Sequence, residues 1–291
     1  MNLPSIKAVA DVPIFNFFNS TQKPFLIPEY QRPYSWGKDQ ALELFEDLKD
    51  FSANSNPSDT YFLGSIVFYT NQNQRREIVG GQQRIVTLFL LFHAIHEHLQ
   101  SNSPLEMNLR GIIWEMNLMG DIIAPDKVRI SSEATSDLAN QKFIDILSNK
   151  AGNGDDNYSA NYRLFQNQLR GFVKNQNAFL KFVNDLLNST HILVIQANDF
   201  QSTLELFERI NDRGLQLSDT DIFKADIYSK LDDSTRKEFI NRWQNHRRCR
   251  IDDDALHVLS FIHSGEEWKI KSARKYATIP QKLSWISGDD E

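Results

Sequence analysis

The stretch "RREIVGGQQRIVTLFLLFHAI", residues 75–95, decides how the rest of the chain is read. Residues 77–79 have the composition of the end of a short strand. The pair Gly80-Gly81 follows, and glycine permits positive φ and a close approach of the backbone to a ligand. Apolar residues then recur at helical spacing, at Ile85, Leu88, Leu91 and Phe92. They predict a helix that begins near Arg84.

A strand, a glycine turn and a helix start together form an anion site. The first helical N–H groups lack partners, and the helix dipole places its positive end there. Arg84 adds a fork of donors that suits phosphate oxygens. The stretch therefore predicts phosphate or nucleotide binding; the alternative is a tight turn with an arginine beside it. Neither a Walker A loop nor a dinucleotide fingerprint is present.

A second polar stretch, "IPEYQRPYSW" at residues 27–36, carries Gln31 and Arg32 among two tyrosines and Trp36. Aromatic rings and a forked guanidinium are suited to hold a base and phosphates. The equal alternative is that the rings fill the core and Arg32 pairs with a carboxylate. Ser35 is the expected N-cap of the following helix.

Composition places the chain among globular proteins. It has 291 residues, 41 % hydrophobic and 24 % charged, with a net charge of −6. Nucleic-acid contact would therefore need a local basic patch. The single cysteine, Cys249, excludes an intrachain disulfide and a multi-cysteine zinc site. We expect a cytoplasmic protein, because neither a signal peptide nor an apolar run long enough for a membrane is visible.

Other patterns predict the remaining elements. "YFLGSIVFYT" at 61–70 reads as a strand that forms a hairpin with 75–79. Short helices are expected within 1–22 and around 106–118 and 133–149. His93 and His96 share a helix face, where a solvated helix end is favoured over a metal site.

We expect three regions: a nucleotide-binding core at 1–100, a helical connection at 101–160 and a helical domain at 161–291. Within the last, "HILVIQ" at 191–196 is a strand expected to return to the core sheet.

The C-terminal part offers two weaker signals for DNA. Two helices within 203–231 resemble a helix-turn-helix, although acids at the start of the second helix would repel phosphates. A basic cluster lies next to Trp243 and comprises Arg242, Arg247, Arg248 and Arg250. Three aspartates follow it at once, which favours a solvated, partly self-neutralised face over a contact with DNA or a partner.

Taken together, three stretches in this order resemble the GmrSD-type restriction endonuclease N-terminal domain. They are 27–36, then 61–69 with 77–88, and then "LFERINDRGLQLSDTDIFKADI" at 206–227. The resemblance covers residues 12–230. It implies an α+β fold, with a small ParB/sulfiredoxin-like mixed sheet and helices followed by a mostly α-helical half.

The resemblance also implies the residues of a site. The nucleotide-binding positions are Gln31, Arg32, Trp36, Gly80, Gly81, Gln82, Gln83, Arg84, Thr87, Asn211 and Lys224. The expected catalytic set is Gln83, Arg84 and Asp221. Gln83 is expected to position water, Arg84 with Arg32 to neutralise phosphates, and Asp221 or Lys224 to close the site from the helical half.

The function implied is an NTP-binding, NTP-hydrolysing component of a defence system that restricts modified phage DNA. NTP and Mg²⁺ are the implied cofactors, and an HNH nuclease, absent from this chain, is the implied partner. One departure affects this expectation: Gly80 stands where the family signature has an aspartate. A carboxylate there could orient water or hold Mg²⁺. The alternative is therefore an inactive, nucleotide-gated sensor or DNA-binding module.

Overall fold

The structure, a computed structural model, describes residues 6–21, 23–134, 137–150 and 154–203. It also describes residues 206, 224, 228, 231, 235–236, 239–240, 262–263 and 266–267. The chain divides into two compact units, Met1–Ile210 and Asn211–Glu291. Within the second unit, β7 (Ile262–His263) pairs antiparallel with β8 (Glu266–Glu267).

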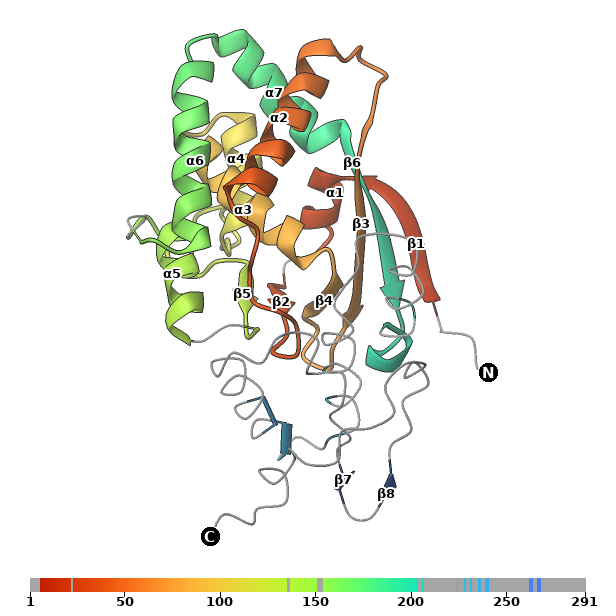
Figure 1. The fold of residues 1–291 in the computed structure, drawn as a ribbon. Coiled ribbons are helices and arrows are strands. Elements are labelled where there is room, and N and C mark those ends of the chain that lie inside the picture. The colour runs from red at the N-terminus through yellow and green to blue at the C-terminus, as the bar shows by residue number, and fades with distance from the viewer. Residues whose placement is uncertain are drawn as a thin grey trace. The chain divides into compact units, whose positions relative to one another are not determined.

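A mixed sheet runs through the first unit in the order β1-β6-β3-β4-β2-β5 (Figure 1). Its strands are β1 (Ile6–Pro13), β2 (Phe25–Ile27), β3 (Tyr61–Thr70), β4 (Arg76–Gly80), β5 (Ile130–Ser132) and β6 (Thr190–Ala197). The pairs β1–β6 and β3–β4 are antiparallel. The pairs β3–β6, β2–β4 and β2–β5 are parallel. The carboxyl ends of β2, β4 and β5 therefore meet at one edge of the sheet.

Helices gather on one side of this sheet (Figure 1). They are α1 (Ile14–Asn19), α2 (Lys38–Asn54), α3 (Gln82–His96), α4 (Pro104–Ile113), α5 (Asp137–Leu147), α6 (Asn157–Phe172) and α7 (Gln176–Asn188). Their apolar faces and the facing strands share one continuous core, in which Ile66, Phe68 and Ile78 represent the sheet. A smaller apolar cluster contains Val67 of β3, Ile195 and Ala197 of β6, and Leu206.

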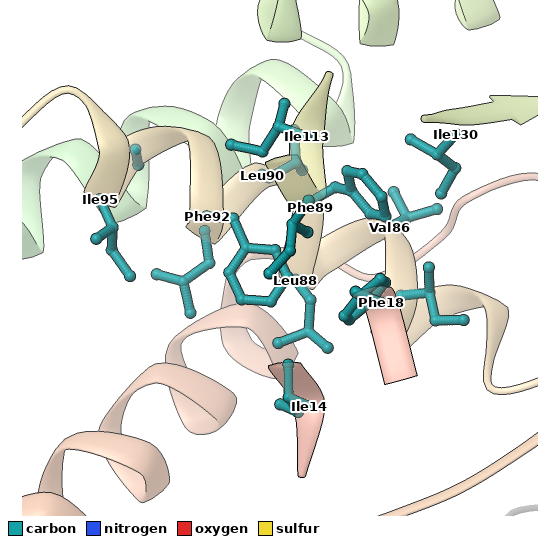
Figure 2. Packing of buried hydrophobic residues seen from close by; sticks show 14 of the residues in the cluster. Ile14, Phe18, Val86, Leu88, Phe89, Leu90, Phe92, Ile95, Ile113 and Ile130 are labelled. Carbon is teal, nitrogen blue, oxygen red and sulfur yellow. The ribbon is translucent and has the colours of Figure 1, made fainter. Parts of the chain in front are cut away.

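Helix α3 is the centre of that core. Every residue from Ile85 to Ile95 is buried, so the helix has no solvated face. A helix that is apolar all round must be enclosed by protein. Figure 2 shows its rings and branched chains against residues of other elements, among them Phe18, Ile113 and Ile130. The Phe18 ring stands edge-on to Phe89 and to Phe92, each at 5.5 Å between centroids. Residues 75–95 thus contain most of the central helix of the fold.

The predicted α+β class is confirmed: helices pack on a mixed sheet. The hairpin of 61–70 with 75–79 is β3–β4, and the 191–196 strand does return to the sheet, as β6 between β1 and β3. Three expectations were wrong or incomplete. Strand β1, within the lead-in, and the short strand β5 were missed. Residue Gly37, not Ser35, precedes α2 as its N-cap.

The third concerns the histidines. We expected a solvated helix end, but His93 is fully buried and its Nδ1 lies 2.9 Å from the Tyr162 hydroxyl. His96 Nε2 lies 2.9 Å from Glu106 Oε1.

Within the described residues, no helix is both long and apolar enough to cross a membrane.

Candidate functional site

The candidate site is the edge of the sheet at which parallel strands β2 and β4 end. The loop that follows β2 carries Gln31, Arg32 and Trp36, and the turn that follows β4 is Gly80-Gly81. Ligands of open α/β sheets bind in the crevice beyond the carboxyl ends of such strands. The topology therefore brings together two of the stretches that the sequence singled out.

Gly81 makes the turn into α3. Its φ of 84° lies in the left-handed region that glycine tolerates, and a Cβ there would lie 2.9 Å from the Ser65 carbonyl oxygen. The first hydrogen bond of the helix runs from the Ile85 N–H to the Gly81 oxygen, at 3.0 Å. In the part of the chain that the structure describes, no side chain caps α3. Its first N–H groups are therefore available to an anion.

Arg84 lies at this helix start and points back onto β3. A Cβ added to Gly64 would lie 2.8 Å from Arg84 Nη2, so the missing side chain makes room for the guanidinium. Arg84 Nη1 donates to the Ser65 carbonyl oxygen at 3.2 Å. Burial lowers the pKa of Arg84, and the nearby Tyr61 hydroxyl opposes that shift. An arginine remains charged even so, and it places a positive charge beside the turn.

Gln83 holds the loop after β2 against α3. Its Oε1 accepts from the N–H groups of Ser35, at 2.7 Å, and Trp36, at 3.2 Å. Its Nε2 donates to the Pro33 carbonyl oxygen at 3.2 Å. The Ser35 hydroxyl also donates to Gln83 Oε1, at 3.4 Å, so the side chain that would cap a helix is engaged with Gln83, and Gly37 precedes α2 instead.

Thr87 provides a second tie between the same loop and α3. Its hydroxyl lies 2.7 Å from the Tyr34 hydroxyl and donates to the Gln83 carbonyl oxygen at 2.9 Å. Asn161 of α6 donates its Nδ2 to the Tyr34 hydroxyl, at 2.8 Å, and to the Trp36 carbonyl oxygen, at 2.9 Å. Burial raises the pKa of Tyr34 to about 12, so this phenol stays neutral. The loop is held from two helices at once.

The remaining predicted residues of this region are buried or partly buried. Gln31 is buried in the loop after β2. Arg32 is half-buried, and its Nε is sealed from solvent with no partner in the described part of the chain. Trp36 is partly buried against the main core. Gln82 is buried at the first position of α3.

Several predicted residues lie outside the described residues: Asn211, Asp221 and the basic cluster of Arg242, Arg247, Arg248 and Arg250. Most of the helix-turn-helix stretch lies outside them as well. Lys224, in the second unit, is described and buried.

Sequence reasoning missed Gly64, Ser65 and Asn161. A glycine inside the strand pattern "YFLGSIVFYT" was the available signal, because such a glycine marks a close approach. Asn161 had no local signal, since its role depends on α6 packing beside the loop.

Helix N–H groups and guanidinium groups are donors suited to a polyanion. Among the described residues, no group of three His, Cys, Asp or Glu side chains could hold a metal ion.

Comparison with known proteins agrees with the resemblance. The family model described as "GmrSD restriction endonuclease, N-terminal domain" matches residues 14–228, which is more than half of the chain. The match contains the turn, the loop after β2 and the 206–227 segment. No protein of the curated set matches the chain.

Proposed function

Since the chain belongs to the GmrSD restriction endonuclease N-terminal domain family, we propose that it is the nucleotide-binding component of a DNA restriction system. In this proposal a nucleoside polyphosphate lies on the Gly80-Gly81 turn, at the start of α3. One observation carries the proposal. The start of α3 follows Gly81, which has a left-handed conformation, and has no side-chain cap, and the Arg84 guanidinium lies next to Gly64.

In this proposal, each described residue of the site has its own role in binding the nucleotide or in holding the loop. The first N–H groups of α3 bind phosphate oxygens, and Arg84 and Arg32 neutralise them. Gln31 and Trp36 contact the nucleoside. Gln83 and Thr87 fix the loop, because their polar atoms are already engaged with it. Asn211, Asp221 and Lys224 remain candidate nucleotide-binding residues because they match the family segment at 206–227.

Whether the bound nucleotide is hydrolysed depends on the turn. Gly80 offers no carboxylate, and the Gln83 amide, which would otherwise position water, holds the loop. These two observations favour the second candidate, a sensor that binds nucleotide without turnover. In either case we propose that an HNH nuclease module cuts the DNA. We also propose that the arginines of residues 242–250 contact the DNA.

Titration calorimetry with each NTP, with and without Mg²⁺, tests the proposal. Arg84→Ala removes charge-assisted hydrogen bonds worth about 1.5–3 kcal/mol, so we expect affinity to fall by at least about tenfold. Arg84→Lys keeps the charge without the fork and is expected to lie between. Arg170→Ala, which removes an exposed arginine of α6, is the matched control. Unchanged affinity in a folded Arg84→Ala protein would overturn the proposal.

Gly80→Asp separates the two candidates. Gly80 is not among the positive-φ glycines of the described residues, so its backbone conformation is one that residues with a side chain also adopt. If the natural protein is inert and Gly80→Asp hydrolyses NTP, the sensor reading holds. If the natural protein already hydrolyses NTP, and Arg84→Ala abolishes this, the NTPase reading holds.

A further inference from the structure

Among the described residues, strand β1 is the outermost strand at one side of the sheet. It is the first strand of the sheet order, with β6 on its inner side (Figure 1). Residues 6–11 are all exposed, including Ile6 at 48 % and Val9 at 55 %. Among the described residues, nothing pairs with its outer side. An unpaired strand edge is a template for a further strand.

The sequence of this strand is nearly palindromic. In "IKAVADV", residues 6–12, Val9 is the centre, and an alanine stands on each side of it. Ile6 and Val12 are both β-branched. Lys7 and Asp11 occupy symmetric positions and carry opposite charges.

Antiparallel pairing with a second copy satisfies both charges at once. A two-fold axis normal to the sheet through Val9 sets Val9 opposite Val9 of the second copy. It then sets each Lys7 opposite an Asp11, so the pair forms twice. Opposite charges across an antiparallel pair stabilise it, and like charges destabilise it.

We propose that β1 joins two copies of this chain through their strand edges, in the register centred on Val9, so that the two sheets become one. The interface is isologous, as expected of a two-fold dimer. The proposal is independent of nucleotide binding, because β1 lies at the opposite part of the sheet order from β2.

Local geometry allows this register. The β1–β6 ladder is regular from Ala8 to Pro13, and its register shifts between Ile6 and Ala8. Lys7 lies at this shift, and its long flexible side chain does not require ideal strand geometry to approach a facing carboxylate. The Asp11 side chain is 62 % exposed and lies 3.3 Å from His191 Nδ1, without hydrogen-bond geometry. It is therefore accessible from outside. The other end of the sheet is unsuited, because β5 has three residues and two of them are buried.

The second copy is favoured over a foreign peptide because only self-pairing supplies Lys7 and Asp11 with each other. The alternative function of these charges is to guard the edge against pairing. The two readings predict opposite results in solution.

Sedimentation over a micromolar concentration series tests the pairing. We expect the natural protein to reach twice the monomer mass. Lys7→Glu and Asp11→Lys each place like charges opposite one another twice, and are expected to weaken dimerisation by about tenfold or more. The double exchange Lys7→Glu/Asp11→Lys restores the pairs and should return the affinity to near the natural value. Lys127→Glu, at an exposed lysine elsewhere, is the control.

Cross-linking tests the register. Directly opposite residues of an antiparallel pair have Cα atoms about 4.5–5.5 Å apart, within disulfide reach. In a Cys249→Ser background, Val9→Cys should form a disulfide dimer readily. Leu118→Cys, at a fully exposed residue far along the chain, should not. A monomer at all concentrations, a double exchange without rescue, or no preference for Val9→Cys would each overturn the proposal.

Discussion

Glycines determine the shape of the candidate site, and their roles differ by what surrounds them. Gly81 has a φ of 84°, and a Cβ added there would lie 2.9 Å from the Ser65 carbonyl oxygen. Gly120 has nearly the same φ, 85°, but a Cβ there would have no neighbour within 4 Å. Gly64 makes room for the Arg84 guanidinium. At the residue scale, the absence of a side chain is what lets three segments approach each other.

The two left-handed glycines provide a matched test. Gly120→Ala introduces only backbone strain, of about 1 kcal/mol. Gly81→Ala introduces the same strain and a clash with a carbonyl, so we expect a loss of about 2–3 kcal/mol in the free energy of unfolding. Urea denaturation of both variants measures the difference. Equal losses would show that the turn yields and that Gly81 is not held by β3.

Residue-level reasoning from the sequence succeeded where the signal was local. The Gly80-Gly81 turn, its helix and the strand before it follow from neighbouring residues. The positions of Gly64 and Asn161 depend on contacts between segments distant in sequence, and no local pattern contains that information. Tyr34 was open between ligand contact and core, and it is buried against Tyr158 at 4.9 Å between ring centroids.

At the element scale, α3 shows why the histidines were misjudged. Its periodicity predicted an apolar stripe, whereas the helix is enclosed on all sides. His93 lies in the contact between α3 and α6 and is bonded to Tyr162. Strands β1 and β5 were missed for the converse reason. One is exposed and rich in alanine, and the other is three residues long, so neither shows strand periodicity strongly.

Enclosure of His93 makes stability depend on pH. Burial lowers its pKa to about 4, against about 6.5 in the unfolded chain. Between these values the unfolded state binds the proton and the folded state does not, so stability falls as pH falls. We expect a loss of about 2 kcal/mol between pH 7 and pH 5 from this residue.

Urea unfolding at the two pH values measures this loss. His93→Gln should remove that part of the pH dependence, while His98→Gln, at an exposed position of the same segment, should retain it. An unchanged pH dependence in His93→Gln would assign the effect to other groups.

At the scale of the whole molecule, the sheet is completed by a strand that comes late in the sequence, β6. Strand β6 lies between β1 and β3, so residues 190–197 connect the first strand to the rest. A protein ending at residue 210 keeps the first compact unit. We expect it to unfold cooperatively, whereas one ending at residue 189 should lose β1 from the sheet and aggregate through the edge of β3. Circular dichroism and sedimentation of the two proteins test this, and a soluble, cooperative 1–189 protein would contradict it.

The position of β6 also has a consequence during translation. Strand β1 leaves the ribosome before the other strands of this sheet, yet its neighbour begins only at Thr190. At roughly 5–20 residues per second, the nascent strand waits on the order of ten seconds or more. Throughout that interval its apolar residues are open to other nascent chains on the same polysome. Holding chaperones therefore matter most for this protein before residues 190–197 have been synthesised.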